Sequence, residues 1–458
     1  MRFALFFGNR GVFPGEIIAA ARREMTEAVT RCGFEYIIMD EKLTRFGAVE
    51  TCLEGEAYAE FLRQNEGNYD GVIICLPNFG DENGISVAMS EVKVPILVQA
   101  YPDVKGEMGP ALRRDAYCGK LAVCNILRQC GIPFSLTDKY AVSPTDPAFD
   151  ADLARFEAIC RTVKGMRRFK VGVFGGRTTP FKTTRFDETT LQKSGITVET
   201  FDLEEIFEKV DSMPDVDAED TLKSLTCYAC YNGRDLKKAM LHAKFIKVFE
   251  EYIANYRLSA IGVRCWEDFQ RKYEIAPCIC MSYLTDKGIP SACETDVTSA
   301  VMMRALSLAS GSPAMLLDVN NNYGDDQQRC ILFHCGVSPA SMMTCTPSVC
   351  AHKLFARHGD CTGTVAGGLI SGPVTVGSLR TENGRIYAFA GTGSMTDDPI
   401  DEDFFGTASV FYKENLKEML KYMSRNGYKH HTVVAKGDVA DIVDEVFRIY
   451  LGYEIDLI

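Results

Sequence analysis

The sequence of 458 residues lacks the long apolar runs and the basic excess that indicate membrane spans or nucleic-acid surfaces. No stretch approaches about 18 uninterrupted apolar residues, and MRFALFFGNRG meets glycine and charge too early for a signal peptide. Lysine and arginine total 50 against 62 aspartates and glutamates, so the net charge is −12. A field of this sign opposes binding to nucleic acid or anionic membranes. We therefore expect a cytoplasmic protein with neither partner.

The 18 cysteines do not follow the spacing of a disulfide framework. One CxxC, from Cys227 to Cys230, has no second pair or flanking histidine that would complete a zinc site. Many other cysteines lie inside apolar runs such as VIICLP. We expect reduced thiols that pack as small hydrophobic side chains, and the sequence assigns them no chemistry.

Apolar strand-like runs alternate with helical stretches through the first two thirds of the chain. RFALFFG, EYIIMD, GVIICLP and PILVQAY come first, and the pattern restarts at FKVGVFGGR. Such alternation predicts parallel sheets with helices on both faces. Beyond about residue 310, strand-like runs follow one another with glycine, asparagine and aspartate turns, which predicts an antiparallel sheet or barrel. The expected architecture is two doubly wound α/β domains and a C-terminal β-rich, barrel-like domain, over residues 1–166, 167–310 and 311–458.

Glycine-rich phosphate loops are incomplete in this sequence. There is no GxxxxGK[ST], and the pair Gly175-Gly176 falls short of a dinucleotide fingerprint. FGNRG leaves the first expected strand, at the edge where an open α/β sheet collects ligands. Asn9 and Arg10 are therefore candidates for hydrogen bonds to a ligand, and a plain turn is the alternative.

Carboxylates follow two neighbouring strands of the second expected domain. Glu267 comes directly after LSAIGVRCW, beside Trp266, and Glu294 and Asp296 follow GIPSAC. The carboxyl ends of parallel strands are where α/β proteins build their sites. As an alternative, Asp296 caps the helix that begins TSAVMMRAL, and both roles can hold together.

Only six histidines occur, and three of them interrupt or open C-terminal strands. His334 lies in CILFHCG, and His430 and His431 open HHTVVA, where adjacent side chains point to opposite faces. A hydrogen-bonded core histidine is the alternative for each. Two carboxylates with one or two histidines suit a divalent ion such as Mn²⁺, with Co²⁺ or Mg²⁺ as substitutes. Of the remaining histidines, His242 is expected on a solvated helix face. His352 and His358 are expected either on the surface or facing a ligand.

The strings RCWEDF, ACETDV, LFHCG and HHTVVAKGD, in this order, resemble the L-fucose/L-arabinose isomerase superfamily. RRDAYCGK at 113–120 and VGVFGGR with FDETTL are similar to its shorter members, so the resemblance extends over nearly the whole chain. It implies an enzyme that interconverts an aldose and a ketose through a cis-enediol, with Mn²⁺ or a similar ion.

The resemblance also implies roles for individual residues. Glu267 and Asp296 match the acidic residues that bind metal and move the proton between C1 and C2, and His431 matches the late metal ligand. His334, Glu294 and His430 are further candidates for the metal or the substrate. The family assembles as trimers or hexamers in which a neighbouring N-terminal domain closes the site. That arrangement implies sugar contacts for Asn9, Arg10 and Asn78. Trp266, beside Glu267, is a further candidate for the sugar.

The substrate is the least determined feature. The resemblance implies fucose, arabinose or a 6-modified hexose such as sulfoquinovose, and an anionic group would be met by Arg10, Arg177, Lys182 or Arg185. Two other functions are compatible with the sequence. One is a sugar-binding module without catalysis, and the other is a metal-dependent aldolase or epimerase with the same enediolate chemistry.

Overall fold

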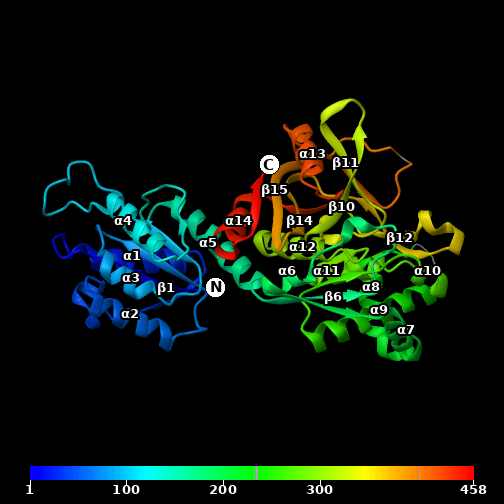
Figure 1. Ribbon diagram of the computed structural model, residues 1–458, viewed down its shortest axis with the longest axis horizontal. Helices are drawn as coiled ribbons and strands as arrows, with labels where there is room; N and C mark the ends of the chain where they lie inside the picture. Colours follow the sequence, from blue (N-terminus) through cyan, green and yellow to red (C-terminus); the bar gives the residue numbers. More distant parts are fainter. Residues whose placement is uncertain (232, 234–235, 402) are drawn as a thin grey trace. The chain divides into compact units, whose positions relative to one another are not determined.

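A computed structural model describes residues 1–231, 233, 236–401 and 403–458 (Figure 1). The chain divides into two compact units, residues 1–164 and 165–458. The second unit contains both a parallel sheet and a barrel, so a domain border near residue 310 stays a prediction. Within the described part of the chain, no helix is both long and apolar enough to cross a membrane.

The first unit is a five-stranded parallel sheet with the order β2-β1-β3-β4-β5. Its buried strands are the apolar runs of the sequence, as expected for a parallel sheet covered on both faces. The strand order reverses between β1 and β3, where open α/β sheets leave a crevice for ligands. The strands are β1 Arg2–Phe7, β2 Glu35–Ile38, β3 Gly71–Leu76, β4 Ile96–Ala100 and β5 Ser135–Leu136. The helices are α1 Ile17–Arg31, α2 Cys52–Gln64, α3 Glu82–Met89, α4 Ala116–Gln129 and α5 Pro147–Met166, which continues into the second unit.

A capping box fixes the first turn of helix α2. The Thr51 hydroxyl accepts a hydrogen bond from the Glu54 amide, and the Glu54 carboxylate accepts one from the Thr51 amide. Two amides that the helix leaves unpaired are thereby satisfied. The T-x-x-E spacing is visible in the sequence and defines this boundary better than the apolar pattern does.

The second unit opens with a four-stranded parallel sheet, β7-β6-β8-β9. Figure 1 shows α9 and α12 on opposite sides of this sheet. The strands are β6 Phe169–Phe174, β7 Ile196–Phe201, β8 Ala260–Val263 and β9 Ser291–Cys293. The helices are α6 Glu188–Lys193, α7 Leu203–Ser212, α8 Glu219–Tyr228, α9 Leu236–Tyr256, α10 Asp268–Tyr273, α11 Cys278–Asp286 and α12 Val297–Ser310.

The C-terminal strands close into a barrel. β16, β11, β10, β17, β14 and β15 pair in that order, and β15 pairs again with β16, so the ring is complete. The pairs within the ring are antiparallel. The predicted barrel-like domain is therefore confirmed. The strands of this region are β10 Met315–Tyr323, β11 Asp326–His334, β12 Ser348–Ala351, β13 Thr362–Gly368, β14 Gly372–Glu382, β15 Arg385–Thr396, β16 Thr407–Tyr412, β17 His431–Lys436 and β18 Glu454–Leu457. The helices are α13 Leu416–Arg425 and α14 Ala440–Glu445.

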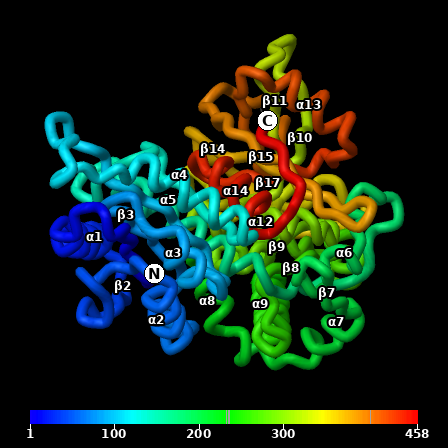
Figure 2. Tube along the Cα trace, turned by 60° about the vertical axis from the view of Figure 1, so that its left-hand side comes forward, coloured from blue at the N-terminus to red at the C-terminus, as the bar shows by residue number. Residues whose placement is uncertain are grey.

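Helix α12 joins the second sheet to the barrel. It packs on β8 and β9 on one side and on β14 and β17 on the other, and both views place it between them (Figures 1 and 2). Its side chains are buried almost all round, as expected for a helix of apolar and small residues in which Arg304 is the one charged side chain. Asp296 lies between β9 and this helix and contacts His431, the first residue of β17. The end of β9 is thereby held against the start of β17.

Candidate active site

The carboxyl ends of β8 and β9 meet the barrel where β11 ends and β17 begins. Glu294 leaves β9 through two residues in the left-handed region, with φ of 60° at Glu294 and 56° at Thr295. Such backbone costs a non-glycine residue about 1–3 kcal/mol and persists where the surroundings impose it. The turn leaves both Glu294 and Asp296 buried and in contact with His431.

Three buried side chains from three segments converge at this place. Glu294, His334 and His431 each offer a ligand atom, and these atoms lie within 4.8 Å of one another. The Glu294 Oε2 and His431 Nε2 atoms are 2.9 Å apart. This contact pairs the buried Glu294 carboxylate with the His431 ring, and the His334 ring lies beside it. A buried carboxylate oxygen next to two imidazoles is the mixed oxygen and nitrogen donor set that suits a divalent cation.

A second group of donors borders the first on its more exposed side. Asp318, His430 and His431 also bring ligand atoms within 4.8 Å of one another. Asp318 Oδ1 is 3.4 Å from His431 Nε2 and 3.8 Å from His430 Nε2. Asp318 was missed by the sequence analysis. The sequence did contain a sign of it, because Asp318 is an acidic residue that directly follows the apolar run AMLL in a strand-like segment.

Asp296 lies on the other side of the His431 ring from Glu294. Its Oδ2 atom is 2.7 Å from His431 Nδ1, and its carboxylate also accepts hydrogen bonds from Ser299 and Lys429. Asp296 caps α12 through the Ser299 amide, as the alternative interpretation expected. The capping role and the contact with His431 therefore hold together. Lys429, which the sequence analysis also missed, is buried against Asp296 and Thr298.

The charges of these groups depend on one another. Burial disfavours the imidazolium of His431, but the hydrogen bond to Asp296 and the nearby Glu294 carboxylate outweigh burial and raise its pKa to about 10. Burial also disfavours the Glu294 carboxylate, but His431 and His334 outweigh it and lower the Glu294 pKa. Burial lowers the pKa of His334, which favours the neutral ring that a metal ligand requires.

Glu267 lies apart from the buried donor groups. Its carboxylate pairs with Arg357, and its Oε2 atom is 3.3 Å from His358 Nε2. The side chain is 30% exposed, compared with 8% for Glu294. Among the described residues, the groups that could hold a metal do not include Glu267. The structure therefore places Glu267 at a more open position than the sequence analysis expected for a metal ligand.

Aromatic side chains connect Glu267 with the histidines. The Phe181 ring contacts Trp266, His430 and His431, with centroids 5.7, 5.5 and 5.4 Å apart. Phe181 belongs to the loop between β6 and α6 that also carries Arg177, Lys182 and Arg185. Trp266 stacks edge-on against Phe355 at 5.9 Å. These rings form an apolar wall next to the donor groups.

The predicted N-terminal contacts form a cluster of their own in the first unit. Asn9 and Asn78 are fully buried at the ends of β1 and β3, where the strand order reverses. The Asn78 amide group donates to Asn9 and to the Pro14 carbonyl, and the Arg10 amide donates to Asn78. The Arg10 guanidinium pairs with Glu82 and lies 4.0 Å above the Phe79 ring. A sugar contact by these residues stays a prediction.

His242 differs from its prediction as a surface residue. It is fully buried on α9, and its Nδ1 atom lies 3.1 Å from the Tyr231 hydroxyl. The lysine-rich sequence around it reflects the exposed face of the helix, whereas His242 lies on the inner face. His352 is also buried, next to Phe355, and His358 contacts Glu267.

Two family models match this chain. The model described as "Fucose/sulfoquinovose isomerase, N-terminal domain" matches residues 4–167, and "L-fucose isomerase, C-terminal domain" matches residues 332–458. The first of these covers the five-stranded sheet, and the second covers His334, His430 and His431. The carboxylates Glu267, Glu294, Asp296 and Asp318 lie in the segment between them.

Curated relatives match over most of their length. Sulfoquinovose isomerase of Alkalicoccus urumqiensis is 24% identical over 398 residues, which cover 85% of this chain and 86% of that protein. Sulfoquinovose isomerase of Priestia aryabhattai is 24% identical over 392 residues, with the same coverage. The protein of the same name from Clostridium sp. (strain MSTE9) is 23% identical over 351 residues, 73% of this chain and 74% of its own. The matches and the fold agree, and the chain is an aldose–ketose isomerase of the fucose isomerase-like family.

Proposed function

We propose that the protein interconverts the aldose and ketose forms of a hexose that carries an anionic group at C6, with sulfoquinovose as the leading substrate. The observation that carries the proposal is the buried convergence of Glu294, His334 and His431 at the carboxyl edge of β9. The three relatives named sulfoquinovose isomerase support the choice of sugar. Fucose and arabinose are the neutral sugars against which this choice is tested.

The donor set fits a hard divalent ion, for which we propose Mn²⁺ with Co²⁺ or Mg²⁺ as substitutes. Octahedral ligands about 2.1 Å from an ion lie about 3 Å from each other. The 2.9 Å between Glu294 Oε2 and His431 Nε2 is of that size, and His431 would give up the proton it shares with Glu294 in order to bind the ion. Glu294, His334 and His431 would hold the ion, and Asp318 offers a further oxygen beside them.

When bound, the ion supplies Lewis-acid polarisation of the sugar carbonyl and stabilises the charge of the enediol. The proton must still move between C1 and C2, and a carboxylate within reach of both carbons can remove and return it. We propose Glu267 for this step because its carboxylate is outside the donor groups and partly open. Arg357 keeps that carboxylate oriented and balances its charge, and His358 lies beside it.

We propose that Asp296 acts through His431. The sequence analysis assigned Asp296 to the metal and to the proton transfer, but its oxygens face Lys429, Ser299 and His431 Nδ1. A carboxylate on one imidazole nitrogen fixes the ring and makes the other nitrogen a better ligand. In this arrangement Glu294 takes the metal-binding place that the sequence analysis assigned to Asp296.

The apolar wall and the adjacent cations are proposed to select the sugar. Phe181 and Trp266 would pack on the sugar ring, as aromatic residues commonly do in ligand pockets. Lys182 is next to Phe181 and exposed, so it is placed to meet a C6 anion. Lys182→Ala should raise KM for sulfoquinovose by about tenfold, a change worth about 1.4 kcal/mol, and leave KM for a neutral sugar unchanged. Lys193→Ala, an exposed lysine on α6, is the control.

We also propose a homo-oligomer, a trimer or hexamer, in the cytoplasm. Exposed apolar side chains support the association: Val104, Met108, Leu112, Tyr117 and Leu121 lie in one segment of the first unit. Of the predicted contacts, Arg10 is partly exposed and would meet the sugar bound by a neighbouring protomer, and the buried Asn9 and Asn78 would hold its loop. Light scattering on the purified protein tests the assembly, and a monomer at micromolar concentration would contradict it.

The activity is tested with a sugar panel in the presence of Mn²⁺. Sulfoquinovose, fucose and arabinose are incubated in D₂O, and NMR follows the conversion and the label at C1 and C2. Glu267→Gln should lower kcat at least 100-fold with metal content retained, whereas Glu294→Gln should lose both. Glu250→Gln, on α9 with no place in the site, is the control and should keep both. Cleavage products, inversion without ketose, or binding without turnover would overturn the proposal.

A further inference from the structure

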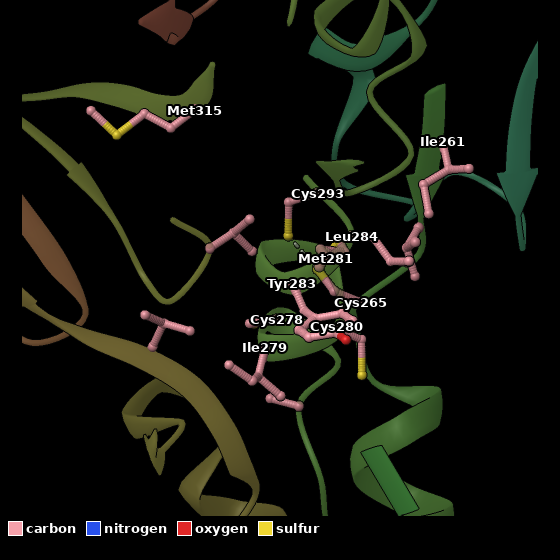
Figure 3. Close-up of a cluster of buried hydrophobic side chains, with 14 of the residues drawn as sticks. Ile261, Cys265, Cys278, Ile279, Cys280, Met281, Tyr283, Leu284, Cys293 and Met315 are labelled. Atoms are coloured by element: carbon pink, nitrogen blue, oxygen red, sulfur yellow. Dashed lines mark hydrogen bonds between the residues drawn. The ribbon is translucent and has the colours of Figure 1, made fainter. Parts of the chain in front are cut away.

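Two buried thiols lie beside the metal-binding carboxylate, and the chemistry above leaves them unused. Cys265 follows β8 and Cys293 ends β9, so the two come from neighbouring parallel strands. Their Sγ atoms are 3.0 Å apart, and both side chains are buried, with exposures of 4% and 0%. Figure 3 shows them in the buried cluster that also contains Cys278 and Met281. Packing alone does not require two thiols at this separation.

Glu294 is the third member of this group. One carboxylate oxygen of Glu294 and the two Sγ atoms lie within 4.8 Å of one another. Glu294 thus borders two sets of donors, with imidazoles on one side and thiols on the other. Its Oε2 atom pairs with His431 Nε2 at 2.9 Å, so a cation on the thiol side would compete with that contact for the carboxylate.

The two sets prefer different ions. Carboxylate and imidazole ligands suit Mn²⁺, whereas thiolates select softer ions such as Zn²⁺ and Cd²⁺. We propose that Cys265, Cys293 and Glu294 form a second cation site for a thiophilic divalent ion, and that its occupation draws Glu294 away from His334 and His431. Each thiol releases its proton to solvent as its sulfur–metal bond forms, and the two positive charges of the ion offset the two thiolates.

The structural part of this inference is independent of the reaction. Inhibition by a soft ion rests on the proposed function, because it requires Glu294 to serve the sugar site. Binding of the ion to the two thiolates is independent of the proposed function. An optical measurement of the sulfur–metal bond therefore separates a failure of this site from a failure of the proposed activity.

The test is a titration of fully reduced, purified protein with Cd²⁺, followed by the ultraviolet charge-transfer absorption of cadmium thiolate. Wild-type protein should take up one Cd²⁺ per chain with this absorption and lose isomerase activity, and dithiothreitol should restore it. Cys293→Ser should lose the absorption and need at least tenfold more Cd²⁺ for inhibition. Cys330→Ser removes a buried thiol on β11 outside the group and should behave as wild type.

If Cys293→Ser does not fold, Cys265→Ala provides the same test from the neighbouring strand. The absorption should again be lost. The inference is overturned if the charge-transfer absorption is absent from reduced wild-type protein, or if it persists in these variants. Inhibition by Cd²⁺ that is equal in wild type and Cys293→Ser overturns the coupling through Glu294. A protein that shows the absorption but no isomerase activity keeps the cation site and refutes the proposed function instead.

Discussion

The pair of Lys429 and Asp296 gives the sharpest prediction for stability. Both side chains are buried, at 5% and 0% exposure, and their charges are in direct contact. Among the described residues, Lys429→Met leaves the Asp296 carboxylate with His431 as its charged partner. Removal of one partner from a buried ion pair costs about 3–5 kcal/mol because the remaining charge stays out of water. Since His431 still offsets part of that charge, we expect the lower end, about 3 kcal/mol.

The expected cost converts to a melting temperature. For a unit of this size, 1 kcal/mol corresponds to about 2 °C, so Lys429→Met should lower Tm by about 6 °C. The measurement is differential scanning calorimetry of metal-free protein in EDTA. Lys436→Met makes the same chemical change at an exposed position of β17 and should stay within about 0.5 kcal/mol of wild type.

The double variant Lys429→Met with Asp296→Asn tests the cause. With both charges removed, the loss should be smaller than the sum of the two single losses, by up to about 3 kcal/mol for groups in contact. A single-variant Tm within 1 °C of wild type, or additive losses in the double variant, would refute the argument that these charges depend on each other.

Three further predictions concern pH, capping and metal. Burial lowers the pKa of His242 to about 4 from the usual 6.5, so the unfolded chain binds more protons as the pH falls. The stabilisation is complete above pH 6.5 and falls by about 2 kcal/mol between pH 8 and pH 5, a slope that urea unfolding should find reduced in His242→Gln. Thr51→Ala should destabilise the first unit by about 1 kcal/mol in urea, whereas Thr30→Ala should be neutral, and equal effects would contradict the capping box. EDTA should abolish turnover, and Mn²⁺ at 100 times its Kd should restore it and add about 2.7 kcal/mol of stability; activity that survives EDTA would exclude the metal.

The order of elements followed from local patterns in the chain. The apolar runs at 2–8 and 71–77 became β1 and β3 because parallel strands covered on both faces must be apolar throughout. The start of α2 at Cys52 is marked by the cap at Thr51, because the apolar pattern begins only after the first turn. His242 was misplaced because the surrounding lysines describe only one face of α9.

The regions and residue types of the site could be predicted from the sequence, but the contacts between its residues could not. The sequence indicates that Glu267, Glu294 and Asp296 follow neighbouring strands, and that His334 and His431 belong to the β-rich region. Which carboxylate faces which histidine depends on the left-handed turn at Glu294 and Thr295, and no pattern in the chain signals this turn. Asp318 and Lys429 were missed because their importance arises only from packing between β10, β17 and α12.

The sequence alone determined the strands and helices, the carboxylate and histidine inventory, and the resemblance to an isomerase family, because these features are local or shared with relatives. Tertiary structure decided how that inventory is divided. Barrel closure and α12 bring Glu294, His334 and His431 together, put Asp296 behind the His431 ring, and leave Glu267 at the open side. The same packing brings Cys265 and Cys293 from separate strands into contact. Spacing along a chain carries no information about such contacts, because they form only when distant segments share one core.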